Sequence, residues 1–247
     1  MRLPLPLSSP RKMAGFNLVE LSIALVIIGF LLGGGLMALQ AQSEIQQTRD
    51  TQRIMEDARE ALIGFTATSF AFDSHPFLPC PDKTAGGGAG TPNDGVEDRL
   101  PAGGCVTPEG NLPWVTLGLS DNTDPWGRRI RYHVTPAFSN STTGIALTSL
   151  GDMTVLDAAA GATIATTIPA LLLSHGRNGR GGITPTGATV PTAGSGADEL
   201  ANTDGNLIFV SHPKTEAGAA GGEFDDQVVW LTPNILFNRL IQAGRLP

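Results

Sequence analysis

The chain has 247 residues, of which 41% are hydrophobic, 16% charged and 6% aromatic, with 31 Gly, 18 Pro and two Cys. This length suffices for one sizeable folded domain with extensions. The net charge of −7 argues against a non-specific nucleic-acid binder, which needs a basic face, and no motif indicates a nucleic-acid partner. Two cysteines cannot build a four-cysteine zinc site, and the composition indicates an acidic, secreted or membrane-anchored protein.

Residues 1–15 form a basic leader that carries Arg2, Arg11 and Lys12 and no acid. Residues 16–39 follow as a run of almost entirely apolar or Gly residues. As a helix this run would be roughly 36 Å long, which is enough to cross the hydrocarbon core of a bilayer. Basic residues ahead of such a run favour a cytoplasmic N-terminus. The pattern therefore predicts a single transmembrane helix with the rest of the chain on the far side.

One acid, Glu20, lies inside the apolar run. A carboxylate in hydrocarbon is costly unless it is paired, so Glu20 is a candidate functional residue. The surrounding string KMAGFNLVELSIALVIIG, residues 12–29, resembles the class III signal of type IV pilins and type II secretion pseudopilins. The resemblance is close over about residues 11–65 and looser beyond.

The resemblance implies a defined maturation. In that family a prepilin peptidase cuts after the Gly and methylates the new N-terminal residue, which predicts cleavage between Gly15 and Phe16 and N-methylation of Phe16. The implied partners are this peptidase, other pilin or pseudopilin subunits and an inner-membrane assembly platform. The implied location is the bacterial inner membrane, with a cytoplasmic N-terminus and a periplasmic head, and afterwards the pilus or pseudopilus.

Glu20 gives this resemblance a physical mechanism. Cleavage would create a charged amine at Phe16, and the Glu20 carboxylate of a neighbouring subunit could neutralise it and set the register of assembly. Gly33, Gly34 and Gly35 are unusual in the same helix, since each Gly costs up to about 1 kcal/mol relative to Ala. Two interpretations stay open: close helix packing, or a weak point that unwinds when the subunit enters a filament.

From residue 40 to about residue 69 the helix is predicted to continue as an amphipathic segment. Its apolar residues fall near one face, which should pack on a globular head formed by residues 70–247. The members of this face are Ile45, Ile54, Ala58, Ala61, Leu62 and Phe65.

The first part of the head is rich in Pro and Gly and holds both cysteines. A bridge between Cys80 and Cys105 would close a loop of about 26 residues and stabilise the head by roughly 3 kcal/mol. Several oxygen-bearing side chains accompany it, but without regular spacing they are predicted to form a solvated turn. These side chains are Asp82, Asn93, Asp94, Glu97 and Asp98.

Alternating patterns then predict an antiparallel sheet, so the fold class is α+β with a long N-terminal helix on a loop-rich head. A short helix is expected at Pro233–Ala243. The predicted strands are Arg128–Thr135, Gly144–Leu150, Ala170–Ser174, Leu207–Ser211 and Gln227–Leu231.

Three strings in the head, DPWG, SHGRNGRGG and FDDQVVW, resemble in order the landmarks of the major pseudopilin, whose equivalent loops hold calcium. The resemblance implies a calcium site at Asn178, Asp225 and Asp226, and no other cofactor. Asn178 stands where that family carries Asp, and residues 182–222 intervene before the two acids. An Asx turn at Asn178 with a capped strand at Asp225 is the alternative.

No catalytic string of the types GxSxG, HExxH or P-loop occurs, so the protein is not expected to be an enzyme. The resemblance predicts a structural subunit of a type IV pilus or type II secretion pseudopilus, and the large head favours a minor or specialised one. The alternative is a singly anchored or secreted exoplasmic protein that binds a ligand without polymerising. Ala41-Gln42-Ser43 would then be an ordinary signal-peptidase site.

Overall fold

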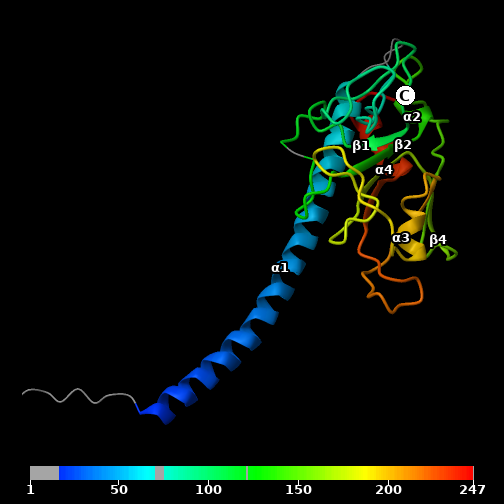
Figure 1. Cartoon of the computed structure of the whole chain (residues 1–247). Coiled ribbons are helices and arrows are strands. Elements are labelled where there is room, and N and C mark those ends of the chain that lie inside the picture. Colours follow the sequence, from blue (N-terminus) through cyan, green and yellow to red (C-terminus); the bar gives the residue numbers. More distant parts are fainter. Residues whose placement is uncertain (1–16, 70–74, 121, 247) are drawn as a thin grey trace, which may run out of the picture. The chain divides into compact units, whose positions relative to one another are not determined.

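The computed structural model describes residues 17–69, 75–120 and 122–246, and describes the backbone but not the side chains of residues 31–40. The chain divides into two compact units between Gln46 and Gln47. The helix α1, Leu18–Thr68, contributes to both units (Figure 1). Gly15 and Phe16, the predicted cleavage and methylation positions, lie outside the described residues.

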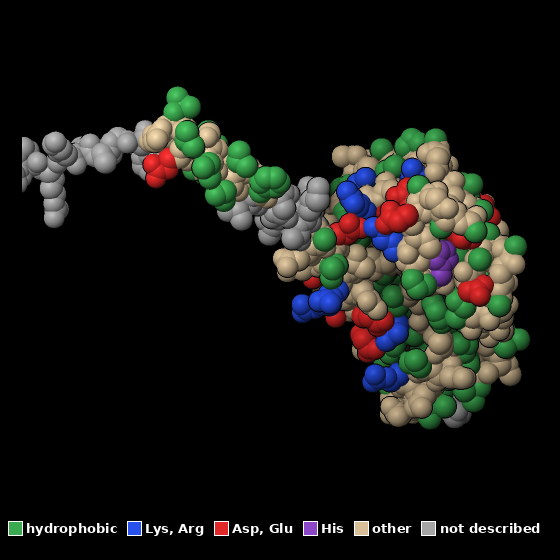
Figure 2. Space-filling model, turned by 90° about the horizontal axis from the view of Figure 1, so that it is seen from below, with side chains coloured by type: hydrophobic (Ala, Val, Ile, Leu, Met, Phe, Trp, Pro, Cys, Tyr) green, Lys and Arg blue, Asp and Glu red, His purple; other side chains and the backbone are tan. Residues whose placement is uncertain are grey.

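In the first unit, α1 presents apolar side chains to solvent. Leu18 is 81% exposed and Phe30 80%, and hydrophobic side chains cover this segment in Figure 2. Glu20 is also exposed. The helical backbone continues without a break through residues 33–35, so the three glycines do not unwind it in the isolated chain.

The predicted location in the inner membrane requires a correction. Within the described residues, no helix is both long enough and apolar enough to cross a bilayer. The single-pass arrangement over residues 16–39, with a cytoplasmic N-terminus and a periplasmic head, is therefore contradicted.

In the second unit, α1 buries one face at helical spacing. Thr51, Met55, Ala58, Leu62 and Thr66 are at most 1% exposed. The two threonines can be buried because each hydroxyl donates to the carbonyl four residues earlier, at 2.8 and 2.6 Å. Of the residues predicted for the apolar face, Ala58 and Leu62 are buried here, whereas Ile45 is 53% exposed.

The main sheet has four strands, and every adjacent pair is antiparallel. The inner strand β5 is buried on both faces, so its sequence is a continuous apolar run rather than an alternation. Leu172 packs in the core beneath α1, while Leu171 and Leu173 pack in a second core on the opposite face. In spatial order the strands are β1 (Glu109–Asn111), β2 (Arg131–Val134), β5 (Ala170–Ser174) and β7 (Gln227–Leu231).

The second core is covered by a three-stranded sheet, in the order β4 (Thr163–Ile168), β3 (Met153–Leu156) and β6 (Ile208–Val210). β3 pairs antiparallel with β4 but parallel with β6. The α+β class with antiparallel pairing is thus confirmed, with one parallel exception. The shorter helices are α2 (Pro136–Ser139), α3 (Ala197–Ala201) and α4 (Pro233–Gln242). Within the second unit, α3 and β4 lie on the side away from this unit's part of α1 (Figure 1).

The strand predicted at Gly144–Leu150 is wrong. Gly144 has a φ of 63°, a left-handed conformation that interrupts an extended segment. Beyond it, the Ser149 amide donates to the Ala146 carbonyl at 2.9 Å, so the chain closes a turn of its own. Ile145 is buried, but Leu147 and Leu150 are 50% and 71% exposed. The alternation of apolar residues in this segment therefore belongs to a turn and not to a β-strand.

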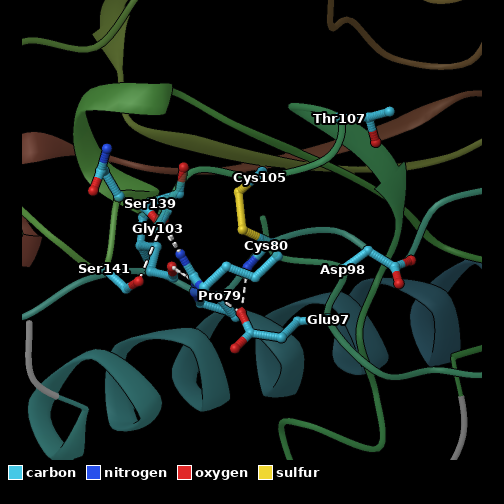
Figure 3. The surroundings of a disulfide bond; sticks show 12 residues. Pro79, Cys80, Glu97, Asp98, Gly103, Cys105, Thr107, Ser139 and Ser141 are labelled. Carbon is cyan, nitrogen blue, oxygen red and sulfur yellow. Dashed lines mark hydrogen bonds and ion pairs between the residues drawn. A yellow bond between two sulfur atoms is a disulfide. The ribbon is translucent and has the colours of Figure 1, made fainter. Parts of the chain in front are cut away.

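The structure contains the predicted disulfide between Cys80 and Cys105, with Cα atoms 5.2 Å apart (Figure 3). Arg99 ties the surrounding loops together. Its guanidinium donates to the Gly103 carbonyl at 2.7 Å and pairs with Glu97 at 2.8 Å. Glu97 in turn accepts the Cys80 amide at 2.8 Å. Hydrogen bonds to backbone groups therefore reinforce the covalent closure.

Candidate metal centre

The loop that follows β5 is the first component of the site. Gly176 has a φ of 56°, and a Cβ at this position would lie 2.2 Å from the Asp225 carbonyl oxygen. Only glycine allows both this conformation and this close approach. The Asn178 side chain then forms an Asx turn, since its Oδ1 accepts the Arg180 amide at 3.0 Å. The loop thereby places Asn178 beside the residues that precede β7.

Three carboxylates meet at this loop. Asp225 and Asp226 lie just before β7, and Glu199 comes from α3. Each offers one carboxylate oxygen, and these atoms all lie within 4.8 Å of one another. The side chains of Glu199 and Asp226 are both 1% exposed. Three ionisable acids are thus gathered out of water.

Each carboxylate is held by one oxygen and keeps the other without a hydrogen bond. Asp225 Oδ2 accepts the Asn178 amide at 2.9 Å, Asp226 Oδ2 accepts Asn202 Nδ2 at 2.8 Å, and Glu199 Oε1 accepts Asn178 Nδ2. Asp225 Oδ1, Asp226 Oδ1 and Glu199 Oε2 have no hydrogen-bond partner among the described residues. Oriented carboxylates with one buried free oxygen each are typical of metal ligands supported by an outer shell.

Asn202 connects the site to the smaller sheet. Its Nδ2 donates to the Val210 carbonyl at 3.1 Å as well as to Asp226, and its Oδ1 accepts the Val210 amide at 2.7 Å. Val210 ends β6, whereas Asp226 precedes β7 of the main sheet. The site therefore lies where the two sheets approach each other.

Burial shapes the electrostatics of the triad. Loss of solvation raises the pKa of Asp225 to about 6, and the charges of Asp226 and Glu199 act in the same direction. Burial likewise raises the pKa of Glu199, with Asp226 as a further cause. The Arg180 guanidinium approaches the triad without a hydrogen bond, with its Nη1 3.6 Å from Glu199 Oε2, and His175 Nδ1 is 3.8 Å from Asp226 Oδ1. A divalent cation would supply the missing positive charge.

The structure brings together the three residues that were predicted to bind calcium. Asp225 and Asp226 are two of the three acids, while Asn178 stands beside them as a hydrogen-bond donor. The third acid, Glu199, was missed because it lies within the long segment between the predicted ligands. An acid in the short helical string ADELA, between Gly-rich stretches, was the only local signal.

The other predicted acidic cluster is not a solvated turn. Asp82 is fully buried, and its two oxygens accept the amides of Asn93 at 2.8 Å and Gly95 at 2.9 Å. Asp98 is 2% exposed and accepts the Lys83 amide at 2.8 Å. Asp82 and Asp98 organise the loop backbone, and backbone amides occupy both oxygens of Asp82.

Comparison with protein-family models, with curated protein sequences and with solved structures gives no match for this chain.

Proposed function

We propose that this chain is a structural subunit, minor or specialised, of a type IV pilus or a type II secretion pseudopilus. The observation that carries the proposal is the string at residues 12–29, with Gly15, Phe16 and Glu20 at the family's positions. A prepilin peptidase would process it, and the assembly platform and other subunits would be its partners. The solvent-exposed apolar side chains from Leu18 to Phe30 support assembly, because such a contiguous surface favours burial against partners.

In this proposal Glu20 acts through charge pairing. Its exposed carboxylate is available to the N-terminal amine of a neighbouring subunit, which cleavage would generate at Phe16. Burying that amine between subunits without a counter-charge would cost several kcal/mol. The apolar side chains would supply the packing energy, and the pair would set the register.

N-terminal sequencing of the mature protein tests the processing. N-methylated Phe16 is the expected first residue, and Gly15→Val should leave a chain about 15 residues longer, because a cleft shaped for Gly rejects a Cβ beside the scissile bond. A mature chain that begins at Glu44 would indicate ordinary signal peptidase and the non-polymerising alternative.

Glu20→Ala tests the assembly mechanism. The variant should be processed normally but be lost from sheared filaments, and co-expressed wild-type protein should partly rescue it. Asp50→Ala is the matched control, since it removes another exposed carboxylate from the same helix. Recovery of Glu20→Ala in filaments at wild-type levels would refute the pairing mechanism.

We also propose that the acidic triad holds calcium in a structural role. The donors are all carboxylate oxygens, which suit a hard cation. Glu199, Asp225 and Asp226 would bind the ion, and backbone carbonyls or water would complete the six to eight oxygens that calcium takes. Calorimetric titration of the chelator-treated chain should show one calcium per chain. Glu199→Gln should abolish binding, and Asp98→Asn, in the other acidic cluster, should retain it.

A further inference from the structure

Arg180 lies beside the proposed metal site but is not one of its ligands. Its Nη1 is 3.6 Å from Glu199 Oε2, which is buried and has no hydrogen-bond partner among the described residues. The same nitrogen donates hydrogen bonds to the Gly194 carbonyl at 2.7 Å and to Glu223 Oε2 at 3.3 Å. One guanidinium nitrogen thus lies between a buried carboxylate and a more exposed one.

The two carboxylates differ in their exposure to solvent. The Glu199 side chain is 1% exposed, whereas those of Glu223 and Arg180 are 30% and 25% exposed. Arg180 therefore reaches from the protein surface toward the buried acid. Its charge is permanent, but one charge cannot neutralise the three buried acids Glu199, Asp225 and Asp226.

We propose that Arg180 competes with the metal ion for Glu199, and that Glu223, which already accepts a hydrogen bond from it, holds the guanidinium alone when the metal binds. This inference rests on the proposed metal site. A divalent ion bound to Glu199 repels a guanidinium this close to the same oxygen. Glu223 lies close enough to hold it with little movement, because the existing contact at 3.3 Å only has to tighten. Metal affinity is then set by the exchange of Arg180 between two partners.

The test is calcium titration of the full-length chain by calorimetry, in a mild detergent that shields the exposed apolar side chains of α1. Arg180→Gln should bind calcium at least about fivefold more tightly than the wild type, which is the scale of a coupling of roughly 1 kcal/mol. Arg180→Lys keeps the charge and should remain near the wild-type affinity. Glu223→Gln removes the alternative partner and should weaken binding.

The double variant separates exchange from simple long-range attraction. If Glu223 acts through Arg180, Glu223→Gln should have no effect in the Arg180→Gln background. If the weakening is equal in both backgrounds, Glu223 is only a distant negative charge and the exchange is refuted. If Arg180→Gln does not fold, Arg180→Lys and the single Glu223→Gln variant still test the exchange of Arg180 between its two partners. An unchanged calcium affinity in Glu223→Gln contradicts that exchange.

The outcomes also separate this inference from the metal site itself. Equal affinities of the wild type and Arg180→Gln, with binding abolished by Glu199→Gln, would overturn the competition and leave the site intact. Binding by Arg180→Gln but not by the wild type would support competition in its strongest form. If no variant binds calcium, both proposals fall.

Discussion

Two loop regions of the head bury acidic side chains, one beside the disulfide and one beside β7. In the first, both oxygens of Asp82 accept backbone amides from the loop it organises. In the second, Glu199, Asp225 and Asp226 each keep one oxygen without a donor among the described residues. Burial alone therefore does not distinguish a structural acid from a ligand. What distinguishes them is whether the fold already satisfies the buried oxygens.

The largest effect is expected from opening the disulfide of the first region. The double variant Cys80→Ser, Cys105→Ser should lower the free energy of unfolding by roughly 3 kcal/mol, because it releases the loop in the unfolded chain. Urea denaturation in chelator measures this loss. The stabilisation gained on adding calcium should be the same in the variant and the wild type. A lost calcium response would show that the two regions are not independent.

At the second region, Glu199→Gln is expected to change the free energy of unfolding by a smaller amount, and the sign of the change should depend on whether calcium is present. At a calcium concentration one hundred times Kd, the wild type should gain about 2.7 kcal/mol, and Glu199→Gln should lose that gain. In chelator Glu199→Gln should be at least as stable as the wild type, because one of three crowded buried charges is removed. Urea denaturation in both conditions provides the measurement.

Glu97→Gln is the matched control for that experiment. Glu97 accepts the Cys80 amide and pairs with Arg99, so its loss should cost about 1–3 kcal/mol whether or not calcium is present. If Glu97→Gln responded to calcium differently from the wild type, or if Glu199→Gln destabilised the chelated protein, the proposed difference between a structural and a metal-binding acidic region would be refuted.

The smallest effect is a pH slope. Burial raises the pKa of Asp82 to about 6, whereas an exposed Asp titrates near 4. The folded state therefore holds this proton more tightly, and the contribution of Asp82 to stability should fall as pH rises from about 4 to about 6. Asp82→Asn should lack this slope. His133, whose pKa burial lowers to about 4, acts in the opposite direction, and subtracting the variant's curve from that of the wild type cancels it.

The same pH series distinguishes the two acidic regions. Calcium binds ionised carboxylates, and the pKa of Asp225 is also raised to about 6. The stabilisation by calcium should thus increase as pH rises through about 6, while the slope due to Asp82 should be the same with and without calcium. An Asp82→Asn variant with the wild-type slope, or a calcium response independent of pH over this interval, would contradict the assignment.

Local patterns in the sequence determined several elements of the fold correctly. Ala58 and Leu62 are buried on α1 as helical spacing predicted, and β5 and β7 begin and end at the predicted residues. The chain's two cysteines form the predicted bridge. The helix and the strands depend on local periodicity, and each cysteine has only one possible partner, so the sequence alone is enough to predict these features. The membrane span failed, because within the described residues no helix meets the length and hydropathy that it requires.

Only the tertiary structure brought Glu199 to Asp225 and Asp226, because that contact depends on how the segment between β5 and β6 folds back through α3. It also decided the parallel pairing of β3 with β6, and it buried Asp82 and Asp98 in a loop whose composition indicates exposure. The physical reason is the same in each case. A side chain's type records what it can bond with, whereas the donors and acceptors around it come from other segments of the chain that only the fold brings close.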